Sequence, residues 1–126
     1  ELTREQRALR VRDEVQVRDC GGTWQRGRAL LDTGNAACTV LDVAFAARLG
    51  LHAGGPPNAA EAQTTLRGIV PGASTQAATM GVVLRLRGVE FRLCCAVSSL
   101  EGGEEVLVGL DVLDNMLAAG FKIEAA

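Results

Sequence analysis

The sequence predicts a mainly β fold with two short helices. Alternating apolar and polar residues, typical of half-buried strands, run through Glu14–Asp19, Met80–Leu86 and Val89–Val97. Glycine-containing turns separate these segments, as expected for neighbouring antiparallel strands. Only Val43–Leu49 and Asp111–Leu117 have an acidic residue at or just before the start and a glycine soon after the end, the pattern of a short capped helix.

The composition indicates one folded domain, residues 1–126, without attraction for polyanions. Of its 126 residues 48% are apolar, enough to bury a core. The 13 basic and 15 acidic residues give a net charge of −2, so neither nucleic acid nor a membrane is an expected partner. No apolar run approaches the ~20 residues of a membrane span, and the charged N-terminus is unlike a signal peptide.

The cysteines do not predict a metal site. Cys20, Cys38, Cys94 and Cys95 lack paired Cys-x-x-Cys spacing, and the single His is too few to complete a site. We therefore expect no metal and no other cofactor. Cys94 and Cys95 are neighbours in a predicted strand and should point to opposite faces. Free thiols suit the cytoplasm or another reducing compartment, although an even number of cysteines leaves disulfides open.

A β-hairpin is predicted to lead into Asp32. The segment Glu1–Asp13 suits either a frayed helix or an edge strand, and its sequence does not decide between them. After the strand Glu14–Asp19, the turn Cys20–Thr23 returns the chain as Trp24–Leu31.

The middle of the chain contains a helix, a loop and a second hairpin. Thr39–Leu41 is a β-prone segment, Asp42 is a suitable N-cap for the helix, and Gly50 ends it. Leu51–Gln63 is rich in Gly and Pro and should be a surface loop. Thr64–Gln76 is predicted to be a hairpin with apolar residues at its tip.

The long strands are expected to form scaffold. Arg85 and Arg87 alternate with apolar residues and should form a solvated face, since two charges are too few for a polyanion site. Trp24 is the only Trp, and we interpret it as a core or rim anchor. Glu105–Val108 should be a further buried strand, ended by Gly109.

Asp32 directly follows the short apolar strand Ala29–Leu31 and would enter an apolar neighbourhood, where a lone charge is costly. In isolation, Asp-Thr-Gly also suits an ordinary turn, with Asp32 bonding its own backbone and Gly34 at positive φ.

Two motifs together resemble the retropepsin-like aspartic proteases: Leu-Leu-Asp-Thr-Gly at 30–34 and Val-Leu-Val-Gly-Leu-Asp-Val-Leu at 106–113. The protease-like domain of the DNA-damage-inducible ubiquitin-shuttle proteins is the most similar group, and the likeness, which includes Arg-Leu-Gly-Leu at 48–51, runs from about Glu14 to the C-terminus. The resemblance implies a retropepsin-like closed β domain that acts as a two-fold homodimer and hydrolyses peptide bonds.

The resemblance also implies roles for single residues. Asp32 would be the catalytic carboxylate, paired with Asp32 of a second copy, because this chemistry needs both a base and an acid. Thr33 would hydrogen-bond across the two loops, Gly34 would allow the backbone to approach the substrate, and Gly109 would pack beneath the site. Asp111 would cap the second helix.

A flap and a pocket are implied as well. The hairpin tip would cover an extended polypeptide substrate, and the C-terminal strand Phe121–Ala126 would join the dimer interface. The expected flap and pocket residues are Leu66, Gly68, Ile69, Val70, Pro71, Gly72, Leu107 and Val108.

The sequence departs from this pattern at Asn35, where the family usually has Ala or Ser, and the run from Asp32 to the helix is one residue longer than is common. The Asn35 amide would be able to donate to an ionised Asp32 and lower the acidic limb of a bell-shaped, acidic activity profile.

Two other readings remain open. One is a catalytically inactive retropepsin-like dimerisation or substrate-docking module, and the other is a small β domain that binds partners through a sheet edge.

Overall fold

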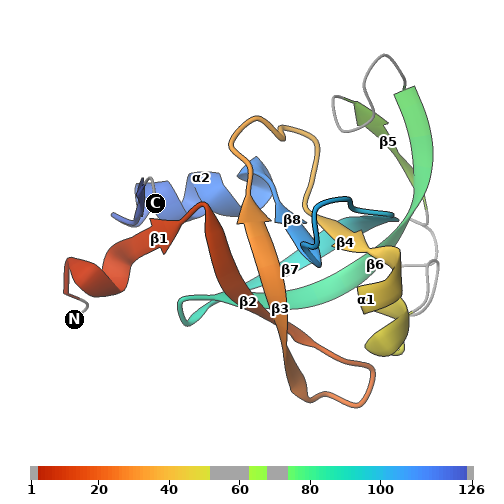
Figure 1. Cartoon of the computed structure of the whole chain (residues 1–126), viewed down its shortest axis with the longest axis horizontal. Coiled ribbons are helices and arrows are strands. Elements are labelled where there is room, and N and C mark those ends of the chain that lie inside the picture. The colour runs from red at the N-terminus through yellow and green to blue at the C-terminus, as the bar shows by residue number, and fades with distance from the viewer. Residues whose placement is uncertain (1–2, 52–62, 68–73, 125–126) are drawn as a thin grey trace.

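The fold is mainly β with two short α-helices, as predicted. The computed structural model describes residues 3–51, 63–67 and 74–124, with the backbone alone for 63–67 and 74–78. Figure 1 shows the elements of these ranges: η1 (Glu5–Arg7), β1 (Ala8–Arg10), β2 (Arg12–Arg18), β3 (Trp24–Leu31), β4 (Val40–Asp42), α1 (Val43–Arg48), β5 (Gln63–Arg67), β6 (Ser74–Leu86), β7 (Val89–Ser98), β8 (Val106–Val108), α2 (Leu110–Ala118) and β9 (Lys122–Glu124).

The main sheet closes on itself. Its strand order is β2-β3-β8-β4-β7-β6-β5, and an additional antiparallel pairing of β2 with β6 joins the two sides. Gln16 pairs with Arg85 and Val17 with Leu84 at this closure. Every strand of the ring from β2 to β6 therefore has a neighbour on both sides, and β3 runs parallel to β8.

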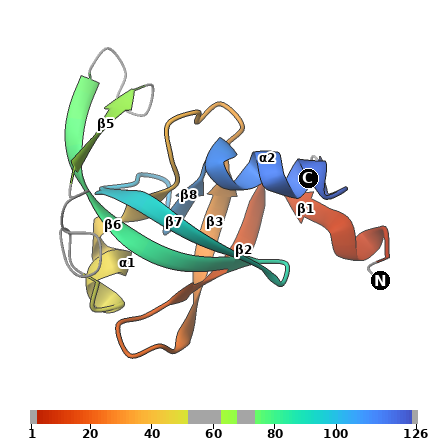
Figure 2. The same ribbon diagram turned by 180° about the vertical axis from the view of Figure 1, so that it is seen from behind.

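The predicted second hairpin is present as two antiparallel arms. β5 pairs with the N-terminal part of β6, from Gln63 opposite Ala78 to Arg67 opposite Ser74. Figures 1 and 2 show β5 and this part of β6 extending away from the closed sheet. The predicted flap tip at Gly68, Ile69, Val70, Pro71 and Gly72 lies outside the described residues, as do the side chains of the arms.

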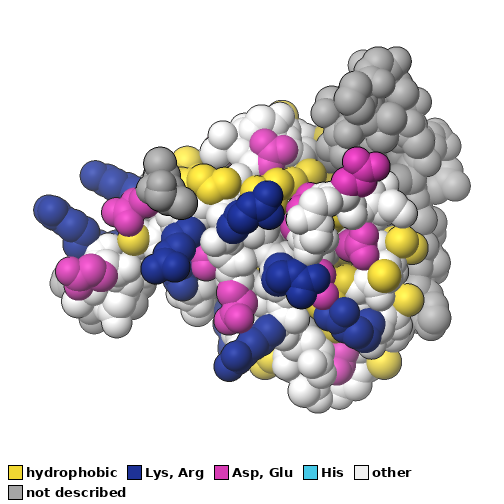
Figure 3. Space-filling model, in the orientation of Figure 1, with side chains coloured by type: hydrophobic (Ala, Val, Ile, Leu, Met, Phe, Trp, Pro, Cys, Tyr) yellow, Lys and Arg dark blue, Asp and Glu magenta, His cyan; other side chains and the backbone are white. Residues whose placement is uncertain are grey.

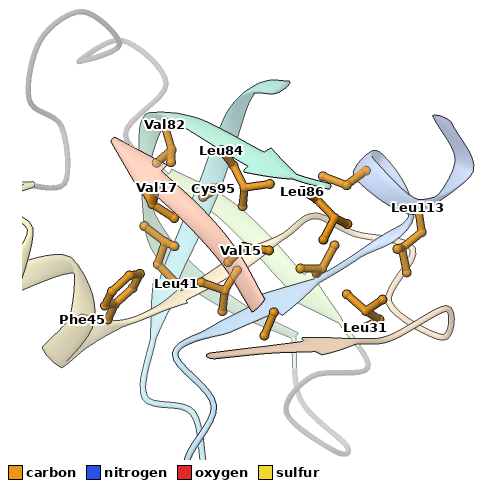
Figure 4. Packing of buried hydrophobic residues seen from close by; sticks show 14 of the residues in the cluster. Val15, Val17, Leu31, Leu41, Phe45, Val82, Leu84, Leu86, Cys95 and Leu113 are labelled. Atoms are coloured by element: carbon orange, nitrogen blue, oxygen red, sulfur yellow. The ribbon is translucent and has the colours of Figure 1, made fainter. Parts of the chain in front are cut away.

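The core fills the inside of the ring (Figure 4). Alternate residues of the strands point inward, as the sequence pattern predicts. The largest fully buried side chains of this core are Phe45, Leu9, Leu41, Leu84, Leu86, Leu113, Met116, Val15, Val17 and Val106, and Val40 is equally buried in a separate cluster.

Helix α1 is capped as predicted. Asp42 accepts from the backbone N–H of Ala44 at 3.1 Å, and Gly50 follows the helix at a φ of 74° that favours glycine. Phe45 of α1 packs against β3 where a Cβ on Gly27 would lie 2.8 Å from its ring. Gly27 therefore makes room for the largest side chain of the core.

The second predicted cap is wrong. The N-cap of α2 is Gly109, with no side-chain cap hydrogen bond, and Asp111 lies in the first turn of the helix. Its carboxylate instead faces Thr39.

The two chain ends form a small parallel sheet. β1 pairs with β9 of the same chain, with Leu9 opposite Ile123. The N-terminal segment thus contains both of its predicted alternatives, a short helical turn and an edge strand. Phe121, predicted as the start of the last strand, precedes β9 and is buried.

The cysteines are free thiols. Cys94 is exposed and Cys95 is buried, which confirms that they point to opposite faces. Burial raises the pKa of Cys95 well above its usual value, with a further contribution from Asp111. Within the described ranges no helix has the length and apolar character needed to span a membrane.

Candidate active site

Asp32 lies where β3 leaves the sheet beside β8. Leu31 is opposite Val108 in the parallel pairing, and the backbone N–H of Asp32 donates to the carbonyl of Val108 at 2.9 Å. The two sequence motifs are therefore adjacent in space. Asp32 is half-buried, while the following Thr33 and Gly34 are exposed.

The Asp-Thr-Gly turn is closed by Asp32 itself. Its Oδ1 accepts from the backbone N–H of Gly34 at 2.9 Å, and its carbonyl accepts from the N–H of Asn35 at 3.1 Å. This pattern fits the ordinary Asx-type turn, except that Gly34 has no positive φ. A Cβ on Gly34 would lie 3.2 Å from Asp32 Oδ1, so the glycine keeps the carboxylate uncrowded.

Asn35 stabilises the loop rather than Asp32. Its side chain is buried, its Nδ2 donates to the carbonyl of Cys38 at 2.6 Å, and its Oδ1 accepts from the N–H of Ala37 at 3.2 Å. Neither hydrogen bond involves the Asp32 carboxylate. The predicted donation to Asp32 is thus not observed in this chain, because the longer loop folds back and uses the amide.

Thr39 and Asp111 connect this loop to α2. Asp111 accepts from the hydroxyl of Thr39 at 2.7 Å and from its backbone N–H at 2.9 Å. Thr39 Oγ1 in turn accepts from the N–H of Gly109 at 3.1 Å. Sequence reasoning missed the contact of Thr39 with Asp111, because the two residues are 72 positions apart and no local pattern links them.

Gly109 lies directly against Asn35. A Cβ there would be 2.9 Å from both Asn35 Nδ2 and the Asn35 carbonyl oxygen, and that carbonyl accepts from the N–H of Leu110. The close approach of the two backbones requires glycine.

An apolar row crosses the outer face of the sheet beside Asp32. Leu30 pairs with Leu107, Leu107 with Val40, and Val40 with Ala96. These four residues, which we call the apolar row, form a cluster separate from the main core, with Cys38 and Leu100 at its margin. Alternation along β3 puts Leu30 and Asp32 on the same side.

The two predicted pocket residues of β8, Leu107 and Val108, lie on opposite faces of the sheet. Leu107 belongs to the apolar row and is 8% exposed, whereas Val108 is fully buried in the main core, so the structure supports a direct substrate contact for neither side chain. The side chain of Leu66 is not described.

Other hollows lie away from Asp32. One of about 650 Å³ is lined by residues of the N-terminal segment together with Arg87 and Glu124. Within the described residues no three His, Cys, Asp or Glu side chains gather as a metal-ligand set.

No model of a known protein family matches the sequence, and no curated protein matches it. Solved structures do match. The EIAV protease complexed with the inhibitor HBY-793 aligns with a TM-score of 0.58 and 22% identity over 90% of each chain. The simian foamy virus (mac) protease aligns with a TM-score of 0.53 and 13% identity over 84% of this chain and 94% of its own.

The protease-like domain of Ddi1 from Leishmania major aligns with a TM-score of 0.49 and 16% identity over 85% of this chain and 77% of that one. The closer resemblance to ubiquitin-shuttle proteins stays a prediction. The viral alignments establish the fold: the chain has a retropepsin-like fold.

Proposed function

We propose that this chain is an aspartic endopeptidase in which two Asp32 carboxyls, one from each subunit of a homodimer, activate a water molecule for attack on a peptide bond. The observation that carries this proposal is the position of Asp32. It is a half-buried carboxylate on an exposed turn, beside an apolar row, on a retropepsin-like fold.

One chain supplies one such carboxylate. Hydrolysis without a metal or a covalent intermediate needs a base to take a proton from water and an acid to protonate the carbonyl oxygen. Asp111 is the other Asp of the two motifs, but both its carboxylate oxygens are bonded to Thr39. A second copy of Asp32 is therefore the natural partner, and a two-fold axis brings it to the same loop. The exposed Thr33 would lie at that contact.

The substrate in this proposal is an extended polypeptide with apolar side chains near the scissile bond. Leu30, the half-buried member of the apolar row beside Asp32, offers the matching surface, since Val40, Ala96 and Leu107 are buried. The hairpin of β5 and β6 would cover the peptide, with Ile69 and Val70 in contact with its side chains. Replacing the hairpin tip by Gly-Gly should raise KM or lower kcat, and unchanged values of both would refute this flap.

The direct test measures cleavage of a set of fluorogenic peptides with apolar residues at the scissile bond. The Asp32→Asn variant should lose hydrolysis at every pH. Asp114→Asn, which makes the same change at an exposed site on α2, should retain it. Hydrolysis by Asp32→Asn would exclude the proposal. A wild-type dimer that cleaves none of the peptides would favour the inactive dimerisation module instead.

A mixing experiment tests whether the site is shared. Wild-type protein is mixed with a growing excess of Asp32→Asn and allowed to exchange subunits. Since a mixed dimer has one Asp32, activity per wild-type chain should fall toward zero. Activity that stays constant, or that accompanies a purely monomeric species in sedimentation, would show that a single chain is sufficient.

A further inference from the structure

Three strands bring arginines together around the only tryptophan. The guanidinium carbon of Arg85 lies 4.1 Å from the centre of the Trp24 ring, and that of Arg18 lies 4.8 Å from it. Trp24 is half-buried at this position. The rim-anchor interpretation of Trp24 therefore holds, whereas Arg85 is stacked on a neighbour and does not extend freely into solvent.

The strand register puts a third arginine, Arg26, on the same face of the sheet as Trp24 and Arg85. Gln16 of β2 pairs with Arg26 of β3 on one side and with Arg85 of β6 on the other. Arg18 pairs with Trp24 in the next row. With neighbouring strands about 4.8 Å apart, Arg26 and Arg85 are separated by about two strand spacings. We call Arg18, Arg26 and Arg85 the arginine triangle.

Among the side chains that the structure describes, none forms an ion pair with these three charges. The ion pairs among the described residues join Arg28 and Arg48 to Glu105, Arg87 to Asp13 and Arg92 to Glu90, and none includes the arginine triangle. Arg18 Nε is buried without a hydrogen-bond acceptor in the described part of the chain.

Of the neighbouring carboxylates, that of Asp19 is engaged elsewhere, whereas those of Glu14 and Glu90 share the outer face with the triangle. Asp19 follows Arg18, but its oxygens accept from the N–H groups of Gly21 and Thr23 and from Gln25. Glu14 and Glu90 lie on the same outer face, opposite Arg28 and Arg85. In Figure 3, Lys and Arg side chains gather over β2 and β3, with acidic side chains between them.

We propose that the arginine triangle is a docking site for an extended acidic segment of a partner polypeptide. Three guanidinium groups spread over three strands match carboxylates repeated along an extended chain better than one small anion. Binding would use mainly side chains, because β2 is paired with β3 along its length and with β6 at Gln16 and Val17.

Two features disfavour a nucleic acid here. A base needs a free aromatic face for stacking, and two guanidinium groups already lie over the Trp24 ring. The net charge of −2 disfavours a long polyanion, whereas an acidic segment of a few residues needs only the local positive charge of the triangle.

Because Trp24 is the only tryptophan, its fluorescence reports directly on the site. The wild-type protein is titrated at low salt with an oligo-glutamate of about ten residues, longer than the span of the triangle. We expect a saturable change in Trp24 emission that weakens as salt is added. Oligo-glutamine of the same length should give no change.

Variants assign the binding to the triangle. The double variant Arg18→Gln with Arg85→Gln should lower the affinity at least about tenfold, as expected for the loss of two charge-assisted hydrogen bonds. Arg26 is exposed and lies outside the stack on Trp24. The Arg26→Gln variant therefore tests the site even if the double variant folds poorly, and its binding is measured by the anisotropy of a labelled peptide. Arg4→Gln, an equal charge change in the N-terminal segment, should bind like the wild type.

The proposal is overturned by an absence of binding at low salt, or by equal affinities of Arg4→Gln and Arg26→Gln. A single-stranded oligonucleotide that binds more tightly than oligo-glutamate would also overturn it, in favour of a nucleic-acid site. None of these outcomes depends on peptide cleavage.

Discussion

Asp111 accepts two hydrogen bonds from Thr39, 72 residues earlier in the chain, one from the hydroxyl and one from the backbone N–H. The contact ties the return of the Asp32 loop to the first turn of α2. Because Thr39 is fully buried, the loss of either partner leaves a buried polar group unsatisfied, which costs more than an exposed hydrogen bond. The loop that carries Asp32 is thus fixed by an element of the core.

Asp111→Asn should lower the free energy of unfolding by about 1–3 kcal/mol, since an amide cannot accept both bonds in the same geometry. Asp111→Ser separates this role from helix capping. Serine is as good an N-cap as aspartate, so a capping site would tolerate it, whereas the contact with Thr39 would be lost. Urea unfolding measures both variants, with Asp114→Asn on the same helix as control. Full stability of Asp111→Ser would restore the capping interpretation.

Gly109→Ala should destabilise the protein by about 1–3 kcal/mol, the usual cost of overpacking. The new Cβ would lie 2.9 Å from the Asn35 carbonyl, which is fixed by its bond to Leu110 and cannot move freely. Gly21→Ala is the matched control, because its Cβ would meet its nearest neighbour at 3.4 Å, without positive φ. The midpoint of thermal unfolding should be clearly lower for Gly109→Ala than for Gly21→Ala. Equal midpoints would show that the loop at Asn35 moves to make room for the new methyl group.

The local parts of the fold were predictable from sequence because their signals are local. The turn Cys20–Thr23 and the cap Asp42 depend on residues a few positions apart. The closure of β2 on β6 and the parallel pairing of β3 with β8 join residues far apart in the chain, and alternation of apolar residues indicates which face is buried but not which strand is the neighbour.

The same limit explains which features of the candidate site could be predicted from the sequence. Asp32 was selected because an acid directly after an apolar strand is unusual and because its motif, together with that at 106–113, resembles the retropepsin-like proteases; its catalytic role stays a prediction. Leu107 and Val108 were predicted together, yet adjacent strand residues point to opposite faces, so only Leu107 joins the apolar row. Asp111 has the sequence position of a cap, and only the packing of α2 against Thr39 shows its actual partner.

Asn35→Ala should weaken the loop and leave the position of the acidic limb of any activity profile unchanged. The substitution removes the partners of the Cys38 carbonyl and the Ala37 N–H, at a cost of about 1–2 kcal/mol. Urea unfolding measures the loss, and the pH profile on one peptide measures the limb, with the exposed Ala36→Ser as control. A displaced limb would mean that Asn35 acts on Asp32 after all.

The interactions of Glu105 predict how the free energy of unfolding depends on pH. It is 7% exposed, its Oε1 accepts from the N–H of Arg28 at 2.9 Å, and its Oε2 pairs with Arg48 at 2.6 Å. Burial alone raises the pKa of Glu105, but the hydrogen bonds from Arg28 and Arg48 and their charges outweigh it, so the pKa lies below its usual value of 4.5.

Because the folded state holds Glu105 in its charged form, its contribution is complete above pH 4.5 and is lost as the pH falls through the lower folded pKa. Glu105→Gln should therefore be less stable than the wild type by about 1–3 kcal/mol near neutral pH, and the difference should shrink as the pH falls below 4.5. Urea unfolding across this range, with the exposed Glu101→Gln as control, measures it. A difference that stays constant with pH would mean that the variant acts through packing and not through the charge of Glu105.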